Sequence, residues 1–178
     1  MTRIPARAYS SRVDLEIELN KILVPTDFSD HADHSFRHAA AIARWSDAEL
    51  IVLHVVEKFR DHSLLYSDIW PFNKPSREYY RELEVKTTER LEEQVRESIG
   101  SDVSFRVIVT SGTPSLEIAS AAEREGADLI VIATHGLGGI RKALLGSTTD
   151  RVLRNADCPV LVMRSGAEGF IRAPRDPD

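Results

Sequence analysis

Glycine and hydroxyl residues gather after the apolar run 129–133, in a pattern that can hold an anion. Gly136 stands near the start of this segment and Gly146 near its end. Three hydroxyl residues follow, namely Ser147, Thr148 and Thr149. Glycine lets a ligand approach the backbone closely, and the first turn of a helix offers unpaired amides and partial positive charge, which favour phosphate. An ordinary loop that ends in a helix cap fits the same residues, so the spacing alone leaves both interpretations open.

A carboxylate follows the first apolar run, 22–25, in the sequence Pro25-Thr26-Asp27. Open α/β sheets bind ligands at the carboxyl ends of their strands, where Asp27 could accept hydrogen bonds from ribose hydroxyls. Helix capping explains the same aspartate equally well. The chain has no Gly-x-Gly-x-x-Gly after this run and no Gly-x-x-x-x-Gly-Lys-Ser/Thr anywhere, which disfavours a dinucleotide dehydrogenase and a P-loop NTPase.

Histidine and cysteine supply the other reactive groups, and their patterns favour structural roles. His34 and His38 are four residues apart and share a helix face, but no third metal ligand is evident, so we interpret them as part of an exposed polar face. His54 lies in an apolar run and is predicted to be a hydrogen-bonded histidine of the core or the pocket edge. Nothing activates Cys158, which is predicted to be a buried small residue.

Five apolar runs of strand length alternate with segments of helical spacing. The runs are 22–25, 50–56, 103–109, 129–133 and 160–163. Parallel neighbours need crossover connections, so this alternation predicts an α/β fold, an open parallel sheet with helices on both faces. The run 129–133 is apolar throughout, as in a strand buried on both faces, whereas 103–109 alternates with polar residues and predicts a sheet edge.

Apolar stripes and end signals predict the helices. One stripe comprises Phe36, Ala39, Ala40 and Ala43, and a second comprises Tyr80, Leu83, Leu91, Val95 and Ile99. Ser29 or Asp30 can cap the first of these helices. Thr113-Pro114 predicts the start of another helix and Gly126 its end. The Ser/Thr-x-x-acid pattern from Ser147 to Asp150 predicts a last helix, capped by Ser147.

One domain is expected from the 178 residues, with additions at both ends and in the middle. Residues 1–19 are predicted to be an extension, in which the alternation over 13–19 indicates a possible extra strand. The domain itself is assigned to residues 20–164, with an aromatic loop insertion at 57–75 that we interpret as an ordered flap. Residues 165–178 are predicted to be a loose tail.

Bulk composition narrows the classes of partner. The net charge of -5 and a pI near 5.7 have the wrong sign for general nucleic-acid binding. No apolar run reaches the roughly 20 residues of a membrane helix. With a single cysteine and no apolar leader, we expect a cytoplasmic protein without nucleic-acid or membrane partners.

Taken together, five blocks in order resemble the universal stress protein family. The blocks are residues 21–29, 53–56, 133–136, 144–147 and 158–162. The resemblance implies a five-stranded parallel sheet in the order 3-2-1-4-5, of the adenine nucleotide alpha hydrolase-like kind. It also implies a homodimer formed through the last strand and, as in many members, a bound ATP or AMP. The strand residues implied in the dimer are Val160, Leu161 and Val162.

The nucleotide-binding branch of the family carries Gly-x-x-Gly, nine residues and Gly-Ser/Thr, which this chain matches except that Ala133 replaces the first glycine. The added methyl is compatible with binding if φ at Ala133 is negative. The resemblance implies that Asp27 holds the ribose, that Val55 holds the adenine through its backbone, and that Ile132 and Ala133 line the base and sugar. Phosphate would be bound by Gly136, Gly146, Ser147 and Thr148. Pro25 and Thr26 complete the implied site.

Two cations and a metal ion have open roles. Arg141 and Lys142 either touch phosphate or remain solvated on the surface. A Mg²⁺ ion could accompany ATP, because it bridges phosphate oxygens and needs few protein ligands.

Three functions remain open from the sequence. The first is an adenine nucleotide-binding protein of stress response or signalling that acts as a homodimer. The alternative is a dimeric interaction module of the same fold without nucleotide. A third is an ATP hydrolase or adenylate-transferring enzyme, for which the sequence names no general base, so we expect at most slow hydrolysis of bound ATP.

Overall fold

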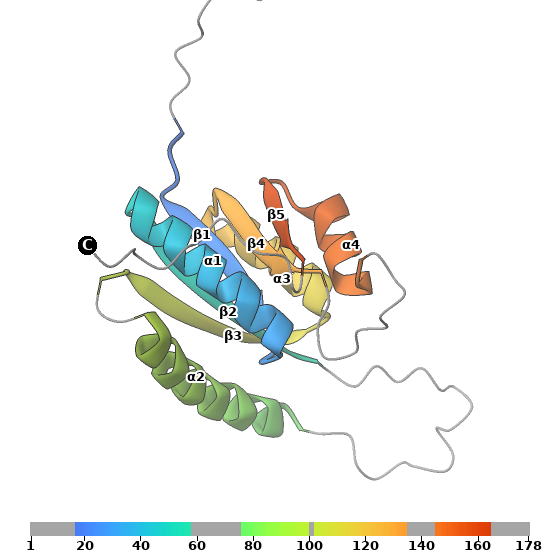
Figure 1. The fold of residues 1–178 in the computed structure, drawn as a ribbon. Helices are drawn as coiled ribbons and strands as arrows, with labels where there is room; N and C mark the ends of the chain where they lie inside the picture. The colour runs from blue at the N-terminus through green and yellow to red at the C-terminus, as the bar shows by residue number, and fades with distance from the viewer. Residues whose placement is uncertain (1–16, 58–75, 100–101, 135–144, 165–178) are drawn as a thin grey trace, which may run out of the picture.

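A parallel sheet forms the centre of the molecule (Figure 1). The structure is a computed structural model that describes residues 17–57, 76–99, 102–134 and 145–164. The strands are β1 (Lys21–Thr26), β2 (Glu49–Glu57), β3 (Phe105–Gly112), β4 (Leu129–Ala133) and β5 (Val160–Met163). All neighbours pair in parallel in the order β3-β2-β1-β4-β5, which confirms the predicted order and fold class.

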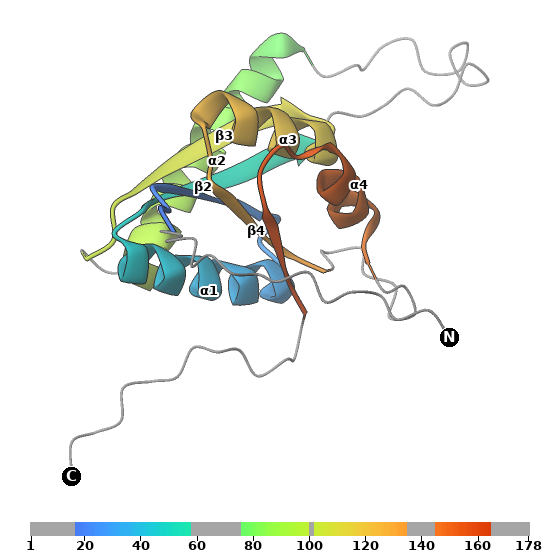
Figure 2. The same ribbon diagram turned by 90° about the horizontal axis from the view of Figure 1, so that it is seen from above.

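Helices cover both faces of the sheet (Figure 2). They are α1 (Asp30–Ser46), α2 (Arg77–Ile99), α3 (Pro114–Glu125) and α4 (Ser147–Asn155). The side chains of α1 and α2 pack in one hydrophobic cluster with one face of the strands, and those of α3 and α4 pack in a second cluster with the other face. Because successive strand residues point to opposite faces, Ile22 and Val24 join the first cluster and Leu23 the second. None of these three is exposed to solvent.

The edge strand β3 is less buried than the central strand β4, as the sequence predicts. All residues of β3 are half-buried, which fits its place at one edge. The strand begins at Phe105, two residues later than the start of the apolar run, although Val103 is buried before it. The run 129–133 coincides with β4, whose residues from Ile130 to Ala133 are all buried.

Helix ends agree with the sequence at α3 and disagree at α4. Thr113 precedes α3, and Gly126 ends it with a positive φ of 63°, a conformation that favours glycine. At α4 the residue before the helix is Gly146, so the prediction that Ser147 caps it is wrong. Ser147 is the first helical residue, and Asp150 instead accepts hydrogen bonds from Arg154 one turn later.

Several predicted segments lie outside the described residues. They include residues 1–16 of the predicted extension 1–19, and with them residues 13–16 of the possible extra strand, most of the insertion 57–75, and the tail 165–178. Residues 17–20 are described and have no strand structure, and Ile17 is 78% exposed. Among the helices that the structure describes, none has the length and apolar character needed to cross a membrane.

Candidate functional site

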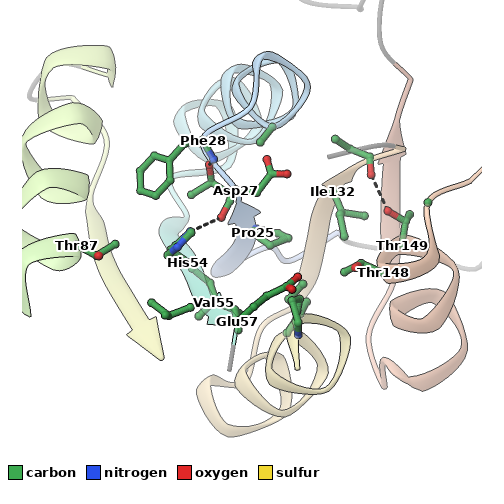
Figure 3. A pocket seen from close by; sticks show the side chains of 18 of the residues that line it. Pro25, Asp27, Phe28, His54, Val55, Glu57, Thr87, Ile132, Thr148 and Thr149 are labelled. Carbon is green, nitrogen blue, oxygen red and sulfur yellow. Dashed lines mark hydrogen bonds between the residues drawn. The ribbon is translucent and has the colours of Figure 1, made fainter. Parts of the chain in front are cut away.

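A cavity of about 740 Å³ opens at the carboxyl end of the sheet, where β1, β2 and β4 end (Figure 3). Helices α1, α2, α3 and α4 also contribute lining residues. Every predicted site residue that the structure describes lines it: Pro25, Thr26, Asp27, Val55, Ile132, Ala133, Gly146, Ser147 and Thr148. Gly136 lies outside the described residues, as do Arg141 and Lys142. Two segments more than a hundred residues apart, at Asp27 and Gly146, therefore border one hollow.

The turn between β1 and α1 is held by side-chain hydrogen bonds. Asp27 Oδ1 accepts from the backbone N–H of Ser29 at 3.1 Å and from its hydroxyl at 2.5 Å. The Ser29 Oγ in turn accepts from the N–H of Ala32 at 3.2 Å, so Ser29 is the cap of α1. Asp27 therefore borders the cavity and braces the capping residue, and it is not itself the helix cap.

An aromatic group stands beside this turn. The Phe28 ring lies 4.6 Å from the His54 ring, centroid to centroid, and the Arg90 guanidinium carbon lies 5.3 Å from the Phe28 centroid. His54 Nδ1 is 2.8 Å from the carbonyl oxygen of Thr26, which can only accept, so Nδ1 carries the proton in this bond. His54 is thus a hydrogen-bonded residue of the pocket edge, as predicted.

The opposite end of the cavity is formed by backbone and hydroxyl groups. The N–H of Gly146 donates to the carbonyl of Thr134 at 2.7 Å, and the hydroxyl of Thr149 donates to the carbonyl of Ala133 at 2.8 Å. No side chain caps α4. Because amides of a first helical turn have no intrahelical acceptor and carry partial positive charge, this end of the cavity favours an anion.

Ala133 is compatible with its position beside the cavity. Among the described residues other than glycine, only Phe28 and Asp47 have a positive φ. Ala133 therefore adopts a backbone conformation that any L-residue can adopt. Glycine is not required there by the backbone, and Ala133 as a residue is 8% exposed at the end of β4.

Between the two ends the walls are mainly apolar. They include Leu53, Val55, Ile118 and Ile132, with Pro114 at the start of α3. Proline has no N–H, so the first residue of α3 offers no donor to the cavity. A cavity with apolar walls, a carboxylate and free amides can take a flat ring, a polyhydroxyl sugar and an anion of one ligand.

Sequence reasoning missed the wall that α2 supplies. Leu83, Thr87 and Arg90 line the cavity from this helix (Figure 3 labels Thr87). Their spacing of three and four residues places them along one side of the helix. The sequence signal for this wall was Thr87, a polar residue that lies on the apolar stripe of the helix, four residues after Leu83. A polar residue on a buried stripe often borders a cavity.

The histidine pair of α1 packs within its own helix. The two rings lie 4.6 Å apart, and His38 Nδ1 is 2.9 Å from the carbonyl oxygen of His34. His38 is only 4% exposed, so its interpretation as part of an exposed polar face is wrong: it lies on the side of α1 that carries Phe36 and Ala39 into the core. The described residues contain no group of three or more histidine, cysteine or acidic side chains that could hold a metal ion.

Cys158 is a poor nucleophile in this environment. The residue is half-buried and packs at the border of the α3–α4 cluster. Burial raises the pKa of its thiol, and Asp128 and Asp157 raise it further by charge repulsion of the thiolate. The thiol is therefore protonated at neutral pH, which agrees with a structural role.

Comparison with known proteins gives a consistent result over most of the chain. Residues 18–164 match the model of the universal stress protein family. Universal stress protein MJ0577 of Methanocaldococcus jannaschii is 35% identical over 159 residues, which cover 84% of this chain and 98% of that protein. The solved structure of universal stress protein UspA from Lactobacillus plantarum has a TM-score of 0.68 at 26% identity and covers 84% of this chain and 100% of its own. A universal stress protein from Archaeoglobus fulgidus, solved in complex with dAMP, shares the fold with a TM-score of 0.55 at 22% identity, over 82% of this chain and 98% of that one.

Proposed function

Because the chain belongs to the universal stress protein family, we propose that it binds an adenine nucleotide, ATP or AMP, in the cavity at the carboxyl end of its sheet. In this proposal the protein acts in the cytoplasm, in stress response or signalling, and as a homodimer. The observation that carries the proposal is the joint lining of one cavity by Asp27 and by the uncapped start of α4 at Gly146.

The proposed ligand pose follows the polarity of the walls. Ribose hydroxyls donate to the Asp27 carboxylate, and the phosphates accept from the amides and hydroxyls of Ser147 and Thr148. The adenine lies against the apolar wall of Val55 and Ile132, and the ribose joins it to the phosphates. A Mg²⁺ ion can accompany ATP by bridging phosphate oxygens, for which few protein ligands are needed.

The structure solved with dAMP supports this proposal at the level of the fold, since it is a complex of a similar fold with an adenine nucleotide. We infer the nucleotide that this chain binds from the residues of its own cavity, not from that structure. The negative φ at Ala133 also supports binding, because the replaced glycine of the motif is then not needed for the backbone path.

Two measurements test the proposal. Mass spectrometry of small molecules released by denaturing the purified protein should identify ATP or AMP, and calorimetry on the emptied protein should show binding of added nucleotide. Asp27→Asn should weaken ATP binding by roughly tenfold or more, because a hydrogen bond to a charged group contributes ~1.5–3 kcal/mol. Asp157→Asn is the matched control, since this exposed aspartate does not line the cavity.

The outcome separates the two main functions. A protein that carries no nucleotide and fails to bind added ATP or AMP would reject the proposal and favour the dimeric interaction module. Binding with unchanged affinity in Asp27→Asn would place the sugar elsewhere.

The proposed dimer uses the open edge of β5. Ile130 donates to the carbonyl of Pro159, and Thr134 donates to that of Met163, so the odd-numbered residues of β5 point their backbone groups at β4. The N–H groups of Val160 and Val162 then point to the open edge, where a second copy can pair. Leu161 supplies apolar surface beside them, because its side chain is half-buried in the monomer.

Removal of one edge donor tests this interface. Val162→Pro should leave the fold intact, since proline is tolerated where the N–H faces outward, and should convert a dimer to a monomer in size-exclusion chromatography with light scattering. A dimer that survives this change, or a wild-type monomer, would contradict the proposed interface.

A further inference from the structure

Phe28 has an unusual backbone conformation beside the cavity. Its φ is 64°, in the left-handed region that glycine, asparagine and aspartate adopt more readily than a bulky aromatic residue. Residues held in this region persist where their surroundings over-determine them, and they cluster at functional sites. The sequence offered no sign of this conformation, because Phe28 reads as an ordinary apolar residue before a helix.

Three contacts hold Phe28 in place. Its N–H donates to the hydroxyl of Thr26 at 3.1 Å. Its ring contacts His54, which is itself fixed by the bond between Nδ1 and the Thr26 carbonyl. Arg90 of α2 places its guanidinium over the ring at a distance at which a cation is attracted to an aromatic face.

The residues on either side of Phe28 carry the proposed sugar contact. Asp27 precedes it, and Ser29, which donates twice to Asp27 Oδ1, follows it. Rotation of the backbone at Phe28 would therefore move Asp27 and Ser29 relative to each other and break these bonds. Figure 3 shows Phe28, His54 and Asp27 grouped where β1 ends, on the side of the cavity that faces α2.

We infer that Phe28 is a positioning residue for Asp27, and that Arg90 acts with it from α2. The Phe28 ring, in contact with His54 and Arg90, keeps the turn at residues 26–29 in the conformation that presents the Asp27 carboxylate to the ribose. This inference rests on the proposed nucleotide function, and it adds that the sugar preference of the site depends on α2.

The test measures sugar discrimination instead of affinity alone. Affinities for ATP and for 2′,3′-dideoxy-ATP are compared by calorimetry in the wild type and in Asp27→Ala. The wild type should prefer ATP by about tenfold or more, the effect of one hydrogen bond to a charged group, and Asp27→Ala should abolish this preference. Phe28→Gly and Phe28→Asn both tolerate the positive φ but lack the ring, and each should lose most of the preference for ATP over dideoxy-ATP, whatever the loss of the ring from the cavity wall does to the two absolute affinities.

Arg90 gives a second arm, because it lies on α2 and contacts the turn through the Phe28 ring. Arg90→Gln should reduce the preference for ATP by severalfold, whereas Arg96→Gln, an exposed arginine of α2 that does not line the cavity, should leave it unchanged. Retention of the full preference in either folded Phe28 variant, or in Arg90→Gln, would overturn the inference while leaving the nucleotide function standing. A wild type that binds neither nucleotide would overturn both.

Discussion

Two helices, α1 and α4, begin at the same cavity, but the backbone amides of their first turns differ in how they are hydrogen-bonded. At α1 the Ser29 hydroxyl accepts from Ala32, and Ser29 is itself bonded to Asp27. At α4 the preceding residue is Gly146, and no side chain caps the helix. The amides of α1 are thus partly satisfied within the protein, whereas those of α4 are left for solvent or a ligand.

The difference indicates which helix would bind phosphate. Both helices carry the partial positive charge of a first turn, so the macrodipole alone does not distinguish them. The first turn of α1 carries two acids, Asp30 and Asp33, and that of α4 carries one, Asp150, so the added negative charge that repels an anion is greater at α1. Ser147 and Thr148 at α4 add hydroxyl donors instead, so α1 favours the sugar end of a nucleotide and α4 the phosphate end.

The largest expected effect is at the start of α4, which no side chain caps. Gly146→Val should lower ATP affinity by about 100-fold or more, because its branched side chain crowds the amides and removes charge-assisted hydrogen bonds of ~1.5–3 kcal/mol each. The fold should persist, since Gly146 has a φ of -68° that valine can adopt. Calorimetry with circular dichroism checks both statements, and Gly146→Ala should give an intermediate loss. Unchanged affinity would locate the phosphates elsewhere.

The attachment of α4 to the sheet gives the next effect. Thr149→Val removes the donor to the Ala133 carbonyl while keeping the side-chain shape, and Thr149 is only 3% exposed. The buried carbonyl then lacks a partner, so the free energy of unfolding should fall by ~1–3 kcal/mol. Urea denaturation measures this loss. Thr148→Val, at the adjacent half-buried residue, should cost less than about 0.5 kcal/mol, and equal losses would show that the bond is not what anchors α4.

A matched pair of serine variants tests the comparison directly. Ser29→Ala should lower the free energy of unfolding by about 1 kcal/mol, the usual cost of losing a capping side chain. Ser147→Ala should change it by less than about 0.5 kcal/mol, because Ser147 caps nothing. Similar losses of unfolding free energy in the two variants, measured by urea denaturation, would contradict the distinction between a capped start of α1 and an uncapped start of α4.

The smallest expected effect is a pH dependence confined to α1. Burial lowers the pKa of His34 below 6.5, and repulsion from His38 and Arg37 adds to this effect. The unfolded chain therefore binds a proton more readily, so the contribution of neutral His34 is complete above pH 6.5 and is lost as the pH falls below that value. Urea midpoints between pH 7 and pH 5 should decrease less in His34→Gln than in the wild type. Identical slopes would contradict this prediction.

The sequence predicts the sheet well because its central strands are buried on both faces. A continuous apolar run such as 129–133 leaves few alternatives, and β4 has these bounds. The alternation of apolar and polar residues over 103–109 identified β3 as an edge strand, because alternation is typical of a strand that is only partly buried. The strand order came from the family resemblance, since periodicity does not say which strands are neighbours.

The finer features of the site depend on contacts that a linear pattern does not contain. The choice between Gly146 and Ser147 as the residue before α4 is a shift of one position, and both residue types are common at helix caps. The positive φ of Phe28 accompanies contacts of its ring with His54 and Arg90, which lie far along the chain. The burial of His38 likewise depends on how α1 is rotated against the sheet.

The bond between Gly146 and Thr134 has a consequence for how this scaffold can change. The N–H of Thr134 also donates to the carbonyl of Met163 in β5. Residues 134 and 146, which flank the segment 135–145, are therefore held next to each other at the sheet. Exchanging that stretch as a cassette would leave α4 where it is, because both junctions are fixed by groups outside it. New ligand preferences could thus be grafted between these junctions without redesigning the hydrophobic packing beneath them.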